Sequence, residues 1–369
     1  MESVGLYVHV PFCVSKCPYC DFYSLPLRDE TVLDRYVDGV LASMERWVQE
    51  LDCRADTLYF GGGTPALLGG ERLARILMCA RERFHLSEGA EITLEANPAD
   101  DLAETLAAFA AAGGNRLSLG MQSAVPLELA VLGRRHTPAD VARTMEDAHR
   151  AGIDNVSLDV MLGISGQTEQ TARYSVEQVA ALGATHLSAY LLKIEPNTPY
   201  GCCPPPLPEE DATADLYLAA MERAEQLGYR QYEISNCALP GRESRHNLKY
   251  WDSLPYLGIG PAAASCVGGR RFTYPRDLSA FLAGQPPVEE QSGIPVGSEE
   301  EYGLLRLRLT EGLRERDFAI RYGHPLPASW RQQAQALPAS LVVTDGDGIR
   351  LSREGFLLSN ALISHILDK

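Results

Sequence analysis

The sequence carries three cysteines close together, Cys13, Cys17 and Cys20, in the stretch HVPFCVSKCPYCDFYS (residues 9–24). With nine cysteines in 369 residues, three at fixed offsets arise by chance about once in 200 chains of this length. The spacing therefore indicates thiolate chemistry. Three kinds of site use thiols in this way: a zinc site, a disulfide with one thiol left over, and an iron–sulfur cluster.

These alternatives make different demands on the chain. Structural zinc needs a fourth nitrogen or sulfur ligand in closed geometry, and the nearest candidate, His9, lies inside a predicted strand. Disulfides are rare in the cytosol, and an odd number of cysteines fits a complete disulfide framework poorly. In a [4Fe–4S] cluster, three thiolates bind three irons and the fourth iron keeps an open position for a substrate. We favour the cluster.

The composition excludes some partners. The chain has 33 Lys and Arg against 49 Asp and Glu, a net charge of −16. This balance argues against extended contact with nucleic acid or an anionic membrane, although a small anionic ligand is not excluded. The first residues, MESVGLYVHV, lack the basic segment of a signal peptide, and no apolar run approaches the roughly 20 residues of a membrane helix. We therefore expect a cytoplasmic protein.

Strand-like and helical segments alternate over the first two-thirds of the chain, which predicts βαβ units on a parallel sheet. Six such units are too few to close an eight-stranded barrel, so we expect an α/β fold with an open, partial (β/α)6 barrel of the TIM type. The predicted strands are 5–10, 56–60, 91–96, 115–120, 155–161 and 186–192, and the predicted helices are 31–51, 70–84, 101–112, 126–132, 138–151 and 168–182.

Beyond residue 193 the alternation breaks. The Pro-rich segment KIEPNTPYGCCPPPLPEEDA (193–212) is expected to be an exposed loop, and a helix over 210–227 and a strand over 230–234 follow it. A second loop over 284–301 suggests a domain boundary. We expect a core over 1–230, a connecting region over 231–295, and a small α+β domain over 296–369 that resembles a winged helix, with a hairpin turning at Gly346–Gly348.

Polar or glycine-rich segments end several of the predicted strands. Taken singly, each is an ordinary turn, cap or surface group. Taken together they indicate a binding site, because the carboxyl ends of parallel strands and the loops that follow them converge at one end of the barrel. The residues concerned are Gly62, Gly63 and Thr64 after strand 2, Glu95 on strand 3, Gln122 after strand 4, Arg134 in the next loop and Asp159 on strand 5.

The stretch YVHVPFCVSKCPYCDF resembles the signature of the radical S-adenosylmethionine (SAM) superfamily. More narrowly, it resembles the branch that holds oxygen-independent coproporphyrinogen III oxidase and the HemW-type haem chaperones. The resemblance covers residues 5 to about 195 and implies that the cysteines hold a [4Fe–4S] cluster. SAM would bind the open iron through its amino and carboxylate groups and be cleaved to a 5′-deoxyadenosyl radical.

The resemblance also implies individual SAM contacts. Gly62, Gly63 and Thr64 match the motif that holds the SAM amino group. Glu95 and Asp159 would bind the ribose hydroxyls, Gln122 other polar groups of the cofactor, and Arg134 a carboxylate, which its planar fork suits. Tyr7 would lie against the methionine part.

Two features separate the members of this branch. The oxidases have a fourth cysteine where this chain has Phe22, and an N-terminal extension before the first strand. The segment HNLKYW (246–251) matches the H-N-x-x-Y-W motif of the HemW-like proteins. Imidazole is a suitable axial ligand for haem iron, which makes His246 the candidate ligand, with Asn247, Tyr250 and Trp251 shaping the site. The nearby GIGPAAAS lacks the histidine of the Gly-Ala-His-Ser segment found in many relatives.

The resemblance implies a haem chaperone that binds haem, a [4Fe–4S] cluster and SAM and delivers haem to respiratory haem proteins, with a further protein as electron donor. The alternative is a radical enzyme acting on a tetrapyrrole, either the coproporphyrinogen oxidase or a haem-degrading transferase. A zinc-stabilised α/β protein is the third. The sequence leaves open whether the chain is an enzyme, whether one or two SAM molecules bind, what Cys202 and Cys203 do, and whether haem bridges a homodimer.

Overall fold

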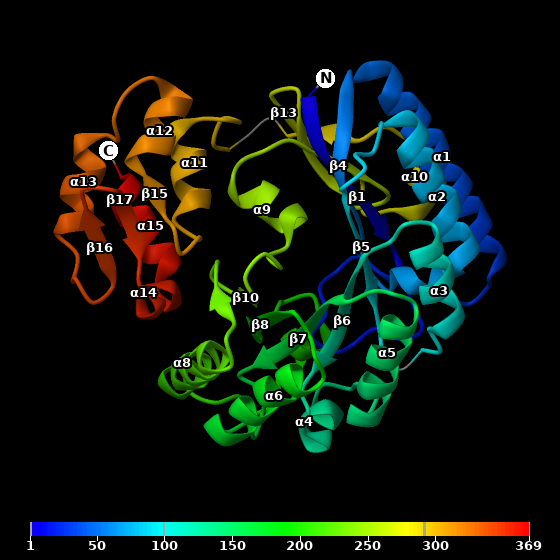
Figure 1. Ribbon diagram of the computed structural model, residues 1–369, viewed down its shortest axis with the longest axis horizontal. Helices are drawn as coiled ribbons and strands as arrows, with labels where there is room; N and C mark the ends of the chain where they lie inside the picture. The colour runs from blue at the N-terminus through cyan, green and yellow to red at the C-terminus, as the bar shows by residue number, and fades with distance from the viewer. Residues whose placement is uncertain (1, 99, 291–292, 369) are drawn as a thin grey trace.

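The computed structural model describes residues 2–98, 100–290 and 293–368, and its centre is a set of six parallel strands in chain order (Figure 1). Each strand carries apolar side chains toward the surrounding helices, because successive side chains alternate between the two faces. The six strands are β1 (Glu2–Val10), β4 (Cys53–Gly62), β5 (Glu91–Ala96), β6 (Arg116–Gln122), β7 (Asn155–Leu162) and β8 (His186–Leu191).

Helices cover the outer face of these strands in an arc (Figure 1). Their apolar stripes pack on the outward-facing strand residues and form one continuous core. The helices of the arc are α1 (Thr31–Glu50), α2 (Gly69–Arg83), α3 (Ala103–Ala111), α4 (Pro126–Val131), α5 (Pro138–Arg150), α6 (Glu169–Ala181) and α8 (Glu210–Gln226), with the short η1 (Pro65–Leu68) before α2. The predicted α/β fold is confirmed, and the ends of the six predicted strands and the helices between them shift by three residues or fewer.

The barrel is open, as predicted. The twelve-stranded sheet runs β14-β13-β12-β11-β1-β4-β5-β6-β7-β8-β10-β9, so its two edges do not meet. The predicted connecting region, 231–295, supplies five of these strands and therefore extends the central sheet. The five strands are β10 (Asn236–Ala238), β11 (Tyr256–Ile259), β12 (Ala264–Val267), β13 (Arg270–Thr273) and β14 (Val288–Glu289), and the helices of this region are α9 (Arg245–Trp251) and α10 (Leu278–Leu282). The short helix α7 (Pro199–Cys202) and the edge strand β9 (Arg230–Gln231) precede them.

One predicted strand was too long. We expected a strand over 230–234, but β9 ends at Gln231. The chain turns back there, since the amide of Tyr232 donates to the carbonyl of Asn236, and Glu233 instead forms an isolated antiparallel bridge with Leu309. The pairing partner lies far along the chain, beyond the reach of a local pattern.

The C-terminal segment has a core of its own, with members from Tyr302 to Ile366. It contains the expected hairpin, β16 and β17, which β15 completes to a three-stranded sheet. Its resemblance to a winged helix stays a prediction. The elements are α11 (Glu299–Arg306), β15 (Leu313–Arg314), α12 (Glu315–Tyr322), α13 (Ala328–Gln335), β16 (Val342–Asp345), β17 (Gly348–Leu351), α14 (Arg353–Leu357) and α15 (Ser359–Leu367).

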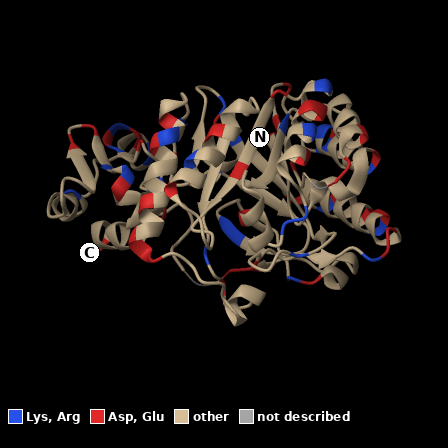
Figure 2. Ribbon diagram, turned by 90° about the horizontal axis from the view of Figure 1, so that it is seen from below, with Lys and Arg blue, Asp and Glu red and all other residues tan. Residues whose placement is uncertain are grey.

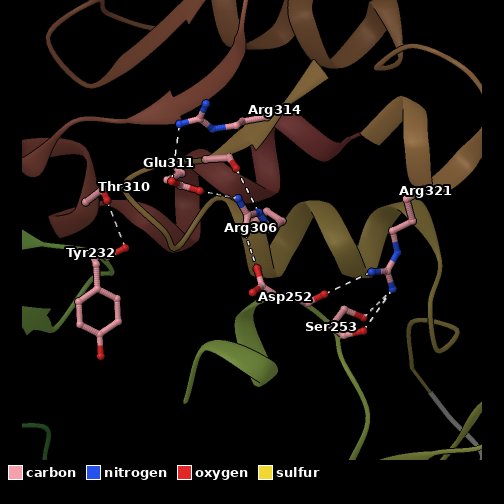
Figure 3. A network of polar contacts seen from close by, with 9 residues as sticks. Tyr232, Asp252, Ser253, Arg306, Thr310, Glu311, Arg314 and Arg321 are labelled. Atoms are coloured by element: carbon pink, nitrogen blue, oxygen red, sulfur yellow. Dashed lines mark hydrogen bonds and ion pairs between the residues drawn. The ribbon is translucent and has the colours of Figure 1, made fainter. Parts of the chain in front are cut away.

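Polar contacts connect this segment to the end of α9 (Figure 3). Arg306 on α11 is 7% exposed and forms an ion pair with Asp252, the residue after α9. Arg321 on α12 donates to the carbonyls of Asp252 and Ser253, at 3.3 and 3.2 Å. The helix that carries HNLKYW is therefore held from the C-terminal side.

Charged residues of both signs are interspersed over the outer helices (Figure 2). Many pair across neighbouring helices, such as Arg72 with Asp34 and Arg223 with Glu177. No helix of the described residues is long and apolar enough to cross a bilayer.

Phe318 provides a test of the C-terminal core. It is fully buried, with ring centroids 4.7 Å from Tyr322 and 5.8 Å from Trp330. We expect Phe318→Ala to lower the free energy of unfolding of this segment by about 3–5 kcal/mol, because it leaves a cavity among aromatic rings. Denaturant unfolding measures the loss. Ile320→Ala, on the same helix but 73% exposed, should change stability by less than about 0.5 kcal/mol, and equal losses in both variants would contradict the packing described.

Candidate functional site

The three cysteines lie on a loop that follows β1. The short strands β2 (Phe12–Cys13) and β3 (Leu25–Pro26) pair and close the base of this loop. Inside it, the amide of Cys20 donates to the carbonyl of Cys17 at 3.2 Å. All three thiols are free and partly exposed, and they line one cavity of about 560 Å³.

The arrangement bears on the zinc alternative. Thiolates that bind one zinc ion lie within about 4.6 Å of each other, because each Zn–S bond is about 2.3 Å. In the part of the chain that the structure describes, no group of three or more His, Cys, Asp or Glu side chains is placed to hold a single ion. The three thiols line one cavity together with the other candidate residues.

The glycine-rich turn after β4 packs directly against the cysteine loop. Gly62 has φ +112°, and a Cβ on Gly63 would lie 2.5 Å from the carbonyl oxygen of Phe12, so neither position accepts a side chain without a shift. The amides of Gly62, Gly63 and Thr64 donate to Glu95, Val10 and Phe12, respectively. An ammonium ligand only donates hydrogen bonds, so the groups that can meet it here are the carbonyl oxygens of the turn.

Two carboxyl groups face the cavity from neighbouring strands. Both oxygens of Glu95 are used: Oε1 accepts from the Tyr59 hydroxyl at 2.8 Å and Oε2 from the Gly62 amide at 3.0 Å. Asp159 accepts from the hydroxyls of Ser188 and Ser118. Burial raises the pKa of Glu95 to about 7 and that of Asp159 to about 6, because the low-dielectric interior disfavours the charged form.

Gln122 and Arg134 line the cavity on the side of the cysteine loop. Gln122 has φ +65°, which is strained for a residue with a side chain and typical of functional sites. Arg134 donates through Nη2 to the carbonyl of Gly120 at 2.6 Å and through Nη1 to the sulfur of Cys17 at 3.4 Å. Its buried Nε has no partner among the described residues.

The sequence interpretation missed Arg116. This residue opens β6, is 2% exposed and lines the same cavity. The signal was present: in RLSLGMQ, polar or small residues alternate with the apolar Leu117, Leu119 and Met121. Since side chains alternate between the faces of a strand, this pattern places positions 116, 118, 120 and 122 on the inner face.

The helix α9 lies at the opposite end of the strands from the cysteine loop. Its first amides, those of Arg245 and His246, donate to the carboxylate of Glu91 at the start of β5, at 3.0 and 2.9 Å. Lys249 forms an ion pair with Asp56, near the start of β4, at 2.8 Å. Of the HNLKYW residues, Asn247 lines the cavity.

The predicted haem ligand is enclosed. His246 is 1% exposed, with Nδ1 2.8 Å from the Thr57 hydroxyl and Nε2 2.8 Å from the Tyr250 hydroxyl. Burial, together with the charge of Lys249, lowers the pKa of His246 to about 3, so the ring is neutral at neutral pH. Since both nitrogens have partners, binding iron requires His246 first to give up its bond to Tyr250 or Thr57.

The remaining predicted residues lie beside the main cavity. Tyr7 and Tyr250 line a separate groove of about 340 Å³, together with Phe22 and with Ala262 and Ala264 of GIGPAAAS. Tyr7 stacks on His246 with ring centroids 6.4 Å apart. Trp251 is partly buried and lines neither space. Cys202 and Cys203 are exposed, and the segment before them contacts the cysteine loop, where the Tyr200 amide donates to the Pro18 carbonyl at 3.0 Å.

Known proteins match both the fold and the sequence. The family model described as Radical SAM superfamily matches residues 7–179. Among solved structures, coproporphyrinogen III oxidase (HemN) from Escherichia coli superposes with a TM-score of 0.83 at 21% identity, covering 99% of this chain and 90% of that one. The fold and the cysteine loop thus define the class: a radical SAM protein.

Sequence relatives narrow the class. The heme chaperone HemW of Mycobacterium tuberculosis is 37% identical, over 99% of this chain and 95% of that protein. HemW of Escherichia coli K12 is 35% identical, over 100% and 99%, and HemW of Bacillus subtilis 168 is 33% identical, over 98% and 99%. The chain belongs to the HemW family of haem chaperones.

Asp159 predicts a pH dependence of the ligand-free protein. Its folded pKa, about 6, lies above the unfolded value of about 3.9, so its contribution is present below pH 4 and lost as the pH rises through 6. We expect Asp159→Asn to match wild type at pH 4 and to exceed its unfolding free energy by about 2–3 kcal/mol at pH 8. The serine hydroxyls can donate to or accept from the amide, which preserves the contacts.

Urea unfolding at both pH values measures this difference. The control is Asp215→Asn, at an exposed position on α8, which should follow wild type throughout. If Asp159→Asn is no more stable than wild type at pH 8, then burial does not raise the pKa of the Asp159 carboxyl group as described.

Proposed function

We propose that this protein binds a [4Fe–4S] cluster and SAM in the cavity and carries haem as cargo to haem proteins of respiration. The observation that supports the proposal most is the single cavity. It joins the three thiols at one end to the inner carboxyl groups and to Asn247 of the HNLKYW helix at the other. The identity with HemW chaperones over nearly the whole chain supports the same conclusion.

The residues fit the two cofactors. Cys13, Cys17 and Cys20 are free thiols that face the cavity and would hold three irons. When bound, such a cluster supplies single electrons, and its open iron supplies a position for the amino and carboxylate groups of SAM. Electrons would come from a partner protein, which stays a prediction.

The chain itself would position SAM. The carbonyls of Gly62 and Gly63, with Thr64, would accept from the SAM ammonium, and the unpartnered Nε of Arg134 would donate to the SAM carboxylate. Glu95 and Asp159 would accept from the ribose hydroxyls, and the strained Gln122 would bind further polar groups. Tyr7 lines the neighbouring groove and not the main cavity. Its direct contact with the methionine part of SAM stays a prediction.

Haem binding by His246 requires an opening step. The ring must lose the Tyr250 hydrogen bond before Nε2 can meet iron, and a neutral hydrogen bond contributes about 1 kcal/mol. Asn247 already faces the cavity, so the HNLKYW helix presents one polar group there while it keeps the imidazole covered. Because the Tyr250 hydroxyl competes with iron for Nε2 of His246, haem would bind reversibly.

A transfer assay tests the function. Protein reconstituted anaerobically with iron and sulfide and loaded with haem should pass haem to an apo-haem protein of a respiratory chain, followed by the recipient's absorbance. The same protein, reduced and supplied with SAM and coproporphyrinogen III, should yield no decarboxylated product. Decarboxylation at enzymatic rates, or haem that stays bound, would overturn the proposal.

The covered His246 predicts opposite effects for two substitutions. Tyr250→Phe removes the hydroxyl that bonds Nε2, so haem should bind about 5-fold more tightly. His246→Ala should lose the axial-ligand signature in the absorbance spectrum. Leu254→Ala, at an exposed position beyond α9, is the control. Unchanged haem spectra and affinity in both variants would remove His246 as the ligand.

A further inference from the structure

Arg116 is a buried cation that forms no ion pair with any of the described residues. It is the largest of the fully buried side chains, and its Nε has no hydrogen-bond partner among the described residues. The two carboxyl groups whose pKa the charge of Arg116 lowers are bonded to other groups: Glu95 to Tyr59 and Gly62, and Asp159 to Ser188 and Ser118. Arg116 acts on them only through space, its charge lowering both pKa values.

An unpaired buried guanidinium lowers the stability of the folded protein. A buried charge normally has an ion-pair partner with hydrogen bonds, because desolvation costs several kcal/mol per ion. A guanidinium also carries five N–H donors in a planar fork that matches a carboxylate. Since Arg116 lines the cavity, an anionic ligand entering that cavity would supply the missing partner.

The location distinguishes this ligand from the SAM carboxylate. Arg116 is the first residue of β6 and pairs in register with Thr93 and Asn155, at the end of the strands where α9 packs. Arg134, in contrast, contacts Cys17 beside the predicted cluster. The cavity therefore has one guanidinium at each end, and the carboxylate of a SAM molecule held by the cluster would lie at the Arg134 end.

We propose that Arg116, together with Asn247, which lines the same cavity, forms a carboxylate-binding subsite that takes a propionate of haem. This subsite rests on the proposed haem-carrying function and adds to it the group by which haem is oriented. Haem carries two propionates, and a bidentate guanidinium pair fixes direction as well as contributing affinity. The side-chain amide of Asn247 supplies a further donor in the same cavity.

Comparing haem with haem dimethyl ester tests this subsite, because the ester lacks the propionate charges and keeps the ring and the iron. We expect reconstituted wild-type protein to bind haem at least about 10-fold more tightly than the ester. Arg116→Met should bind both equally, at the wild-type affinity for the ester, and Arg116→Lys should keep part of the preference. The control Arg54→Met, at an exposed position of β4, should keep all of it.

Two further measurements separate the subsite from a structural role. Thermal unfolding of ligand-free Arg116→Met at pH 4, where Glu95 and Asp159 are protonated, should occur no lower than in wild type, because the substitution then removes a buried charge that has no charged partner. SAM affinity should be unchanged in the same variant. If Arg116→Met does not fold, the comparison of wild type with Arg116→Lys decides.

The outcomes distinguish this inference from the proposed function. Wild-type protein that binds haem and its ester equally would overturn the subsite and leave the haem-carrying function standing, as would a full preference retained in Arg116→Met. Loss of SAM affinity in that variant, with the haem preference unchanged, would assign Arg116 to the cofactor instead. Wild-type protein that binds neither porphyrin would overturn the proposed function itself.

Discussion

The parallel pairing of β1 with β4 on one side and β11 on the other is the contact on which the site depends. It fixes the direction in which the chain leaves β1 and hence the position of the cysteine loop. Side-chain contacts then hold that loop: the Tyr36 hydroxyl donates to the His9 carbonyl at 2.6 Å, and His9 Nε2 lies 2.9 Å from the Tyr23 carbonyl. The glycine turn at the end of β4 closes against Phe12, which no larger residue would allow.

The same pairing produces an interior that is not an ordinary core. The outward faces of the strands are apolar and pack on helices, whereas the inward faces carry Glu95, Asp159 and Arg116. Burying these groups costs stability, and the protein limits the cost by hydrogen-bonding each carboxyl group with neutral donors. The strained backbone at Gln122, with φ +65°, lowers the stability further. Because the destabilising groups all line one cavity, we infer that the fold is organised around ligands that enter that cavity.

Much of this was predictable from local patterns. Alternating segments predicted the open barrel, and the order of motifs predicted that Glu95, Gln122, Arg134 and Asp159 meet at one cavity, because parallel strands leave no other arrangement of their carboxyl ends. The alternation in β6 also places Arg116 on the inner face, but a rule confined to the carboxyl ends of strands does not select a residue at the beginning of one.

The environment of His246 was a different matter. The HNLKYW motif marks the residue, but Thr57, which bonds its Nδ1, is 189 positions away in the sequence, and Glu91, which holds its amide, is 155 positions away. No local pattern reports that both nitrogens of a histidine are used. The position of the helix α9 likewise depends on the ion pair between Asp252 and Arg306 of the C-terminal segment (Figure 3).

These anchors decide how His246 can reach iron. Moving α9 as a body would break the Glu91 cap, the Lys249–Asp56 ion pair and the Arg306–Asp252 ion pair together, and each hydrogen bond to a charged group contributes about 1.5–3 kcal/mol. Rotating the imidazole breaks its side-chain hydrogen bonds, at about 1 kcal/mol each, and leaves the helix in place. Side-chain rotation on a fixed helix is therefore the less costly route, and the ion pairs that hold α9 are what make the motion local.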